Sequence, residues 1–169
     1  MNIREAILAE HSREHALRIA TYAIQNKKKF KELMHCYMDP DYRLSQRAAW
    51  SVSWAARKNP AMIQPYIGEL VKRLQDDTVH PAVIRNAVRV LEELDIPEEY
   101  HGEVMNSCFQ FLESPTTPAA IKAFSMTVLY HLSKYYPEIK QELKLIIEEN
   151  WEHEIPAFKS RGRKILKTL

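Results

Sequence analysis

Apolar side chains recur at helical spacing along most of the chain. They are clearest in residues 81–94, where five of them fall on one face of a helix because residues three and four apart lie side by side. A turn that contains Asp77 and the His80–Pro81 pair precedes this stretch. The pattern predicts an amphipathic helix after a turn. The apolar positions are Val83, Ala87, Val90, Leu91 and Leu94.

The same plan occurs 38 residues earlier, where Asp39 corresponds to Asp77 and Arg47 corresponds to Arg85. A repeat of this length with one helix pair per period is typical of α-solenoids. We therefore predict an all-α fold, a right-handed α-α superhelix of about five helix pairs. Residues 1–169 are expected to form a single repeat domain.

Proline positions support this register. Pro81, Pro118 and Pro156 each open a predicted helix, at separations of 37 and 38 residues, and the first turn of a helix tolerates proline because its amides lack helical partners. Pro65 falls inside a predicted helix and should bend or shorten its first turn. The predicted helices after the first pair are about 30–37, 41–57, 60–75, 81–94, 98–112, 119–135, 138–152 and 156–167.

The N-terminal region carries a weaker signal. Asn2 and Glu5 have the spacing of a capping box, which opens a helix. The apolar stripe then breaks between Glu10 and His15. This break predicts a short helix followed by a longer one, with one long helix as the alternative.

These features resemble the repeats of HEAT proteins, which belong to the HEAT/armadillo group. Such repeats combine a proline-bearing first helix, an Asp in the turn, and a second helix with Val, Arg and Ala before further apolar residues. Asp77, Val83, Arg85 and Ala87 fit this pattern, whereas Pro115 stands where a later repeat would have its Asp. The resemblance implies a ladder of Asp and Arg side chains between neighbouring repeats. Its members here would be Asp39, Arg47, Asp77 and Arg85.

In that ladder Arg85 has a structural role, so its loss should first lower stability. Contact of Arg47 and Arg85 with an anionic ligand is the alternative interpretation, because guanidinium groups bind carboxylates and phosphates through paired hydrogen bonds.

Composition restricts the choice of function only weakly. The chain has 169 residues, 46% of them hydrophobic, and a formal net charge of +2, which favours no class of partner. Residues 27–31 and 157–169 are basic, and residues 92–99 are acidic; such runs are usually solvated faces. No apolar run reaches the roughly 18 residues that cross a bilayer. We expect a cytoplasmic protein without a membrane partner.

The sequence offers no positive case for an enzyme, and no cofactor is expected. Cys36 and Cys108 lie among apolar residues and are predicted to be small core residues. His11 and His15 match the spelling H-x-x-E-H of one zinc protease class. A further ligand is lacking and the apolar stripe breaks there, so we expect no metal and two solvent-facing histidines.

The second helices of the pairs are expected to line a concave surface. Repeating the period through their non-core positions gives two candidate rows for partner binding. The first row is Ser51, Arg89, Thr127 and Lys164, and the second row is Trp54, Glu92, Tyr130 and Lys167. Trp54 and Tyr130 would anchor a partner, although Trp54 could instead pack against a neighbouring helix. Trp50 and Trp151 are expected in the core.

Architecture favours a non-catalytic scaffold that presents this surface to a protein or peptide. The alternative is nucleic-acid binding, because the chain is similar in architecture to HEAT-like alkylpurine DNA glycosylases, which hold duplex DNA in a basic groove. The near-neutral charge, the acidic Glu92 and Glu93, the short chain and the lack of a Trp–Asp pair within a second helix count against it. An adaptor role within a larger assembly is the remaining hypothesis. The basic residues that favour nucleic acid are Arg43, Arg47, Arg57, Lys58, Arg89 and Lys164.

Overall fold

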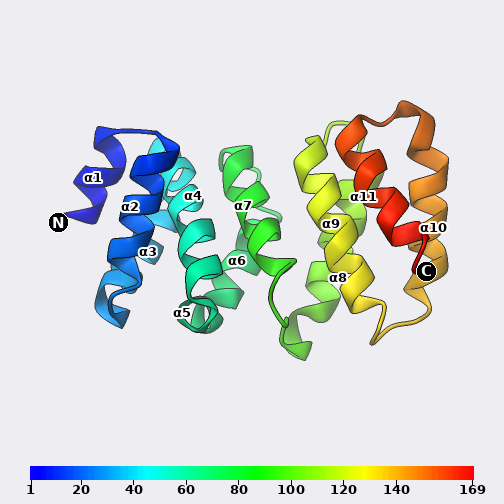
Figure 1. The fold of residues 1–169 in the computed structure, drawn as a ribbon, viewed down its shortest axis with the longest axis horizontal. Helices are drawn as coiled ribbons and strands as arrows, with labels where there is room; N and C mark the ends of the chain where they lie inside the picture. Colours follow the sequence, from blue (N-terminus) through cyan, green and yellow to red (C-terminus); the bar gives the residue numbers. More distant parts are fainter. The chain divides into compact units, whose positions relative to one another are not determined.

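The computed structural model describes residues 1–169 and contains helices and turns but no strand (Figure 1). Its helices form five pairs, so the predicted all-α repeat class is confirmed. The chain divides into two compact units, Met1–Leu94 and Asp95–Leu169, which are described separately. The single domain expected over residues 1–169 stays a prediction. No helix is long and apolar enough to span a bilayer.

The first unit begins with the short helix α1 followed by the longer α2, and continues with two further pairs. Its elements are α1 (Ile3–Ala9), α2 (Arg13–Ala23), α3 (Lys27–Tyr37), α4 (Tyr42–Lys58), α5 (Pro60–Ile63), η1 (Gln64–Tyr66), α6 (Ile67–Arg73) and α7 (Pro81–Leu91). The second unit contains two pairs with short 3₁₀ turns before or between their helices. Its elements are η2 (Glu98–Tyr100), α8 (His101–Glu113), α9 (Ala119–Leu132), α10 (Ile139–Asn150), η3 (Trp151–His153) and α11 (Pro156–Leu166).

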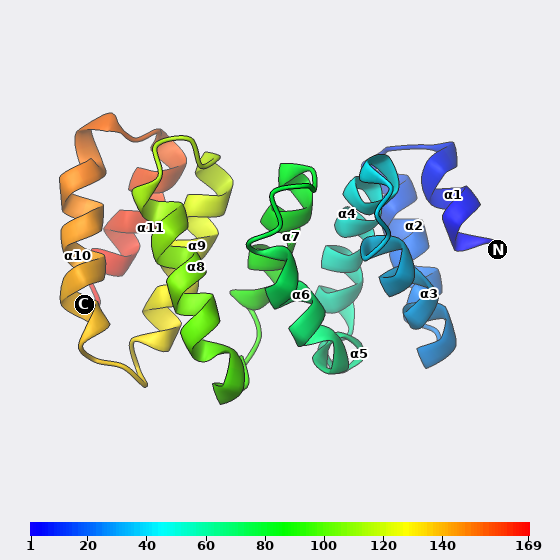
Figure 2. The same ribbon diagram turned by 180° about the vertical axis from the view of Figure 1, so that it is seen from behind.

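Each unit has two layers of helices. In the first unit α4 packs between α2 and α7, while α3 and the α5–α6 segment lie behind them (Figures 1 and 2). In the second unit α9 packs against α11 on one side and against α8 on the other. We call α2, α4 and α7 in the first unit, and α9 and α11 in the second, the second-helix layer of that unit.

Side-chain caps account for the N-terminal boundaries. The side chain of Asn2 accepts a hydrogen bond from the backbone of Glu5, and Ser12 does the same for His15 at 3.2 Å. Such caps satisfy amides that have no helical partner. Asn2 therefore opens α1, and Ser12 opens α2 as a separate helix, so the predicted short helix followed by a longer one is confirmed.

The effect predicted for Pro65 is also confirmed. Residues 60–73 do not form one continuous helix but α5, a 3₁₀ turn that contains Pro65, and α6. Proline cannot donate the helical hydrogen bond, so the tighter 3₁₀ turn carries the chain through this point.

The repeat spacing explains why the first pair is hard to recognise. The second helices begin at Arg13, Tyr42, Pro81, Ala119 and Pro156, so successive starts are 29, 39, 38 and 37 residues apart. Only the first interval departs from the period.

Cys36 and Cys108 are buried in the core, as predicted, and burial raises the pKa of the Cys108 thiol to about 12.

Candidate functional site

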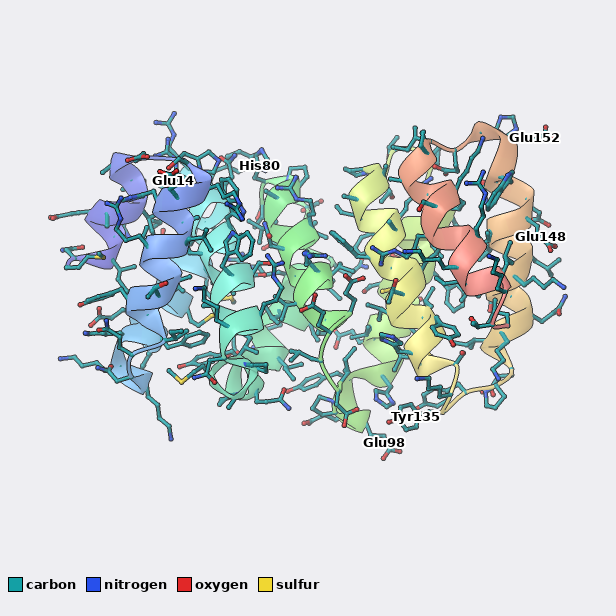
Figure 3. All side chains as sticks on the ribbon, viewed as in Figure 1. Glu14, His80, Glu98, Tyr135, Glu148 and Glu152 are labelled. Atoms are coloured by element: carbon teal, nitrogen blue, oxygen red, sulfur yellow. The ribbon has the colours of Figure 1, made fainter.

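The second-helix layers carry an unequal distribution of charge. Helices α4, α7, α9 and α11 contain no Asp or Glu, and α2 contains only Glu14. The acidic residues lie instead on the other helices, including Glu148 on α10 (Figure 3), and in the turns that connect the helices. Each second-helix layer therefore has an excess of positive charge, although the net charge of the chain is only +2. The basic residues of these layers are Arg13, Arg18, Arg43, Arg47, Arg57, Lys58, Arg85, Arg89, Lys122, Lys159, Arg161, Arg163 and Lys164.

A pocket of about 330 Å³ opens between α4 and α7 in the first unit. We call it the α4–α7 pocket. Its walls are polar and aromatic, and none of its lining side chains is acidic. The lining residues are His11, Gln46, Trp50, His80, Ala82, Arg85 and Asn86.

His80 forms the rim of this pocket at the N-terminus of α7, where Figure 3 labels it. The backbone N–H of Ala82 donates to Nδ1 of His80 at 2.9 Å, so the neutral ring carries its proton on Nε2. The ring also packs edge-on against Tyr42, with 5.4 Å between centroids. Burial lowers the pKa of His80, and the positive charge of Arg85 lowers it further.

His11 closes the pocket from the connection between α1 and α2. Its ring meets Trp50 edge-on at 5.4 Å between centroids. Burial is the main cause that lowers the pKa of His11, followed by the charges of Arg47 and His80. Arg85 lies on α7, is exposed, and donates no hydrogen bond within the protein. The pocket thus gathers hydrogen-bond donors from three segments of the chain.

Trp54 lies one helical turn beyond Trp50 and is half-buried. The Arg57 guanidinium carbon stacks 4.0 Å from the centre of its ring, and that of Arg13 lies 5.3 Å away. The indole Nε1 is buried without a hydrogen-bond partner. Cation–π contacts of this kind contribute about 0.5–1 kcal/mol at exposed sites. Trp54 therefore packs against basic side chains of its own unit, and its role as a partner anchor stays a prediction.

Two members of the predicted rows do not offer an exposed surface. Ser51 is 1% exposed and donates from Oγ to the Ala16 carbonyl at 3.1 Å, which ties α4 to α2. Glu92 is 7% exposed and accepts a hydrogen bond from Arg89 Nη1 at 3.2 Å. Their assignment to a partner-binding face was wrong. A repeat period alone does not tell which side of a helix is buried against a neighbouring helix.

The remaining row members are at least partly accessible. Thr127 is half-buried, and its Oγ1 accepts a hydrogen bond from Arg161. Tyr130 is half-buried, with the Lys134 amine 5.8 Å from its ring centre. In the same unit Lys164 and Lys167 are exposed at the end of the chain. Their part in binding stays a prediction.

Trp50 and Trp151 were expected in the core, but both are half-buried. Trp50 lines the α4–α7 pocket. Trp151 packs beside Gly162, and a Cβ added to Gly162 would lie 2.9 Å from Trp151 Cζ3. The Arg163 guanidinium carbon lies 5.5 Å from the centre of the Trp151 ring. Amphipathic aromatic rings commonly occupy such boundaries between core and solvent.

The residues predicted for the Asp–Arg ladder do not form it. Arg47 donates to the Leu8 carbonyl at 2.9 Å and not to Asp39, which instead accepts from Arg4 at 2.8 Å. Asp77 and Arg85 are both exposed. The assignment of Arg47, Asp77 and Arg85 to the ladder was therefore wrong.

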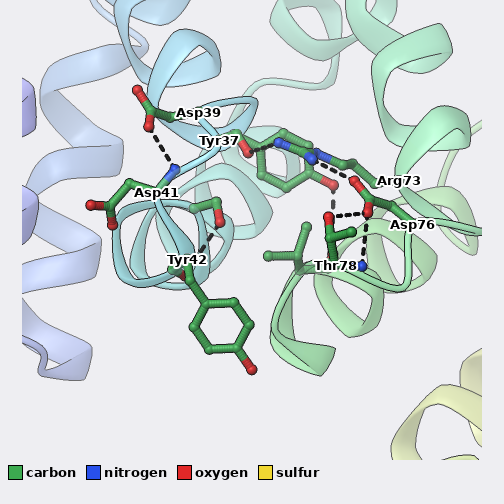
Figure 4. Close-up of polar contacts among 9 residues, drawn as sticks. Tyr37, Asp39, Asp41, Tyr42, Arg73, Asp76 and Thr78 are labelled. Carbon is green, nitrogen blue, oxygen red and sulfur yellow. Dashed lines mark hydrogen bonds and ion pairs between the residues drawn. The ribbon is translucent and has the colours of Figure 1, made fainter.

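The interaction between repeats is made by Arg73 at the end of α6 (Figure 4). Its Nη1 donates to Asp76 at 2.8 Å, and its Nη2 donates to the Tyr37 carbonyl of the preceding pair at 3.0 Å. Asp76 lies 37 residues after Asp39, and each accepts a hydrogen bond from the backbone two residues later. The backbone bond from Asp41 lowers the pKa of Asp39, followed by the bond from Arg4, whereas the Thr78 hydroxyl is the main cause of the lowered pKa of Asp76. Asp76, and not its neighbour Asp77, is thus the equivalent of Asp39.

His11 and His15 do not share a metal site. The Nε2 of His15 contacts the Ala6 carbonyl, whereas His11 packs on Trp50. His15 is half-buried, so the expectation that both histidines face solvent was wrong for this one. No cluster of three or more potential metal ligands occurs in the structure.

The second unit contains a pocket of about 430 Å³ whose lining, unlike that of the α4–α7 pocket, includes acidic side chains. Asp95 and Glu98 line it together with Tyr135, which is 61% exposed and packs against His101 at 5.4 Å between ring centroids (Figure 3). Both nitrogens of His101 have partners, the Ile96 carbonyl and the Tyr136 hydroxyl, so this ring has a structural role.

Comparison with known proteins yields one match. The family model of the HEAT repeat domain matches residues 3–169, and so covers both units. No curated protein and no solved structure matches the chain.

Proposed function

The chain belongs to the HEAT-repeat family, and from this premise we propose that it is a non-catalytic scaffold whose second-helix layers bind an acidic protein or peptide. The observation that carries the proposal is the charge of these layers, in which Glu14 is the only acidic residue. Complementary charge guides encounter and fixes the orientation of a partner more than it adds affinity.

The proposal includes no chemical step. The polar side chains of the α4–α7 pocket include two histidines, an arginine and two amides, and its lining contains no Ser, Thr, Cys, Lys or carboxylate. Such a set can bind and orient an anion, but it offers the histidines no hydroxyl, thiol or amine nucleophile to activate.

Nucleic acid is the second candidate, because its phosphates would be attracted by the same positive charge. Binding of single strands or flipped bases also needs aromatic faces on which bases can stack. Here the ring of Trp54 is covered by Arg57 and Arg13, and Trp50 is half-buried beside His11. The two tryptophan rings of this layer are therefore less available for stacking, which favours an acidic polypeptide.

A direct test compares a fluorescent poly-glutamate peptide with a DNA duplex of similar charge, by anisotropy at low and high salt. A double variant, Arg43→Glu with Arg85→Glu, reverses two exposed charges of the second-helix layer. The matched control, Lys28→Glu with Lys31→Glu, makes the same change on α3 in the opposite layer.

We expect the peptide to bind, and the second-helix variant to weaken that binding by about tenfold or more, which corresponds to 1.4 kcal/mol. The α3 control should change the affinity little. Equal losses in both variants would show that only total charge matters and would refute the proposal. Binding of DNA without binding of the peptide would instead establish the second candidate. Affinity purification from the native cell, with and without nuclease, would then identify the partner.

A further inference from the structure

We propose that the α4–α7 pocket is an oxyanion site that takes a carboxylate or phosphate group. We assign the bound carboxylate or phosphate to the acidic partner, and this assignment rests on the proposed function. The pocket would then be the place where that partner is anchored. Several positions of the second-helix layers are basic, but this pocket is where donors from separate segments line one open pocket.

Several donors of the pocket are available to a ligand, although the Asn86 amide donates to the Ala82 carbonyl at 2.8 Å. Neither the Arg85 guanidinium nor the Gln46 amide donates a hydrogen bond within the protein. The Ala82 amide occupies Nδ1 of His80, so the N–H that His80 can offer is at Nε2. An arginine with its donors unused can bind both oxygens of a carboxylate or phosphate at once.

The surroundings also favour an anion. Arg85 lines the pocket with His80, and the charge of Arg47 acts on His11, so positive charge is already concentrated here. Burial lowers the pKa of both histidines, and these arginine charges lower it further. A bound anion would relieve this repulsion. The pocket lies at the N-terminus of α7, whose dipole presents partial positive charge. Trp50 forms part of the wall and limits water on one side, so the hydrogen bonds would act in a lower dielectric than on an open surface.

The size of the pocket sets what can enter. Its volume of about 330 Å³ is at the small end of ligand sites. It therefore suits one anionic side chain, a chain-terminal carboxylate or a phosphorylated side chain. Longer contacts of the partner would fall on the exposed basic residues around it, such as Arg43.

The test titrates the full chain with inorganic phosphate and, separately, with acetate at constant pH and ionic strength. Histidine ring C–H signals and the Trp50 indole N–H signal are followed by NMR. The variant Arg85→Gln removes the main charged donor from an exposed position, so its fold should be retained. The matched control is Arg43→Gln, an exposed arginine of the same layer that does not line the pocket.

We expect saturable shifts of the His11, His80 and Trp50 signals in the unmodified chain. Arg85→Gln should weaken this binding by about tenfold, and Arg43→Gln should change it less than twofold. Saturation by phosphate alone would identify a phosphorylated group, and saturation by acetate alone would identify a carboxylate. If neither anion gives saturable shifts up to about 20 mM, the binding is too weak to define a site. That result would overturn the inference. Equal weakening in the two variants would overturn it as well.

The outcome is separable from that of the proposed function. If poly-glutamate binds the second-helix layer but Arg85→Gln and Arg43→Gln weaken it equally, the scaffold function holds and the pocket is not its anchor. If phosphate or acetate saturates the pocket but poly-glutamate does not bind, the site exists and its ligand is not an acidic polypeptide.

Discussion

Replacing Arg73 with alanine should destabilise the first unit by about 3 kcal/mol. The Arg73 side chain is only 9% exposed, and its guanidinium joins Asp76 to the Tyr37 carbonyl at the end of α3. Without it, that carbonyl would lose the donor from the neighbouring pair. An unsatisfied buried acceptor costs about 1–3 kcal/mol.

Two smaller losses add to this one. The aliphatic stem of Arg73 is buried, and removing it loses about 0.8 kcal/mol for each buried methylene group. The bond to Asp76 contributes less, because the Asp76 side chain is 25% exposed and keeps its hydrogen bonds to Thr78. Together these effects support a loss of about 3 kcal/mol, within the range measured when one partner of a buried pair is removed.

The matched control is Arg85→Ala. Arg85 is exposed and donates no hydrogen bond within the protein, so its loss should change stability by less than about 0.5 kcal/mol. The resemblance to HEAT repeats predicted the opposite, a structural role for Arg85. Arg73→Lys should fall between the two, because an ammonium group keeps the charge but cannot reach both acceptors with a planar fork.

The assay is urea unfolding followed by circular dichroism, combined with hydrogen exchange of the α3 and α6 amides. Exchange is needed because two compact units need not unfold in one transition. For Arg73→Ala, we expect a lower midpoint and faster exchange confined to the first unit. A loss for Arg85→Ala that equals or exceeds the loss for Arg73→Ala would refute the ladder assigned from the structure.

Two further predictions concern the second unit and the effect of pH. Gly162→Ala should lower stability by about 1 kcal/mol despite its better helix propensity, because the new Cβ would lie 2.9 Å from Trp151 Cζ3 and 3.1 Å from Ile147 Cγ2. The control is Gly102→Ala, whose new Cβ would have no atom within 4 Å, so this change should be neutral or stabilising. Thermal unfolding of both variants is the measurement, and a gain in stability for both would contradict the close contact. The pKa values of Asp39 and Asp76 are lowered in the folded chain, so their stabilisation is present above the unfolded pKa of about 3.9 and is lost as the pH falls through the folded values. The double variant Asp39→Asn with Asp76→Asn should therefore flatten the loss of urea stability below about pH 4, and an unchanged slope would exclude these two groups as its source.

Local chemistry made much of the fold predictable. A proline fixes its own φ angle and lacks an amide donor. Pro65 therefore interrupts the helix whatever the helix packs against. Asn2 caps its helix through a contact within three residues, as its spacing from Glu5 predicted. Such interactions depend on nearby sequence alone, which is why they could be predicted before the structure was known.

The ladder needed information that a period does not contain. Asp76 and Asp77 are adjacent, and both fit a repeat of 37 or 38 residues from Asp39. The choice between them depends on which carboxylate turns toward Arg73, and this follows from how α6 ends. Arg4 takes the part that Arg47 was expected to play because α1 is close enough to reach Asp39. Long side chains choose partners by distance in space, so a repeat spacing accurate to one residue is insufficient.

The binding surface was hidden by summing charge over the chain. Acidic residues on the other helices and in the connecting turns offset the basic second helices and the lysines of α3, leaving a net charge of +2. Only the assignment of each helix to a layer reveals the excess. Exposed charges contribute little to stability, so folding alone gives no reason for α4, α7, α9 and α11 to lack acidic residues. An effect that folding does not require, and that recurs in both units, is better explained by what the surface binds. The poly-glutamate experiment therefore tests the feature of this chain that its architecture leaves unexplained.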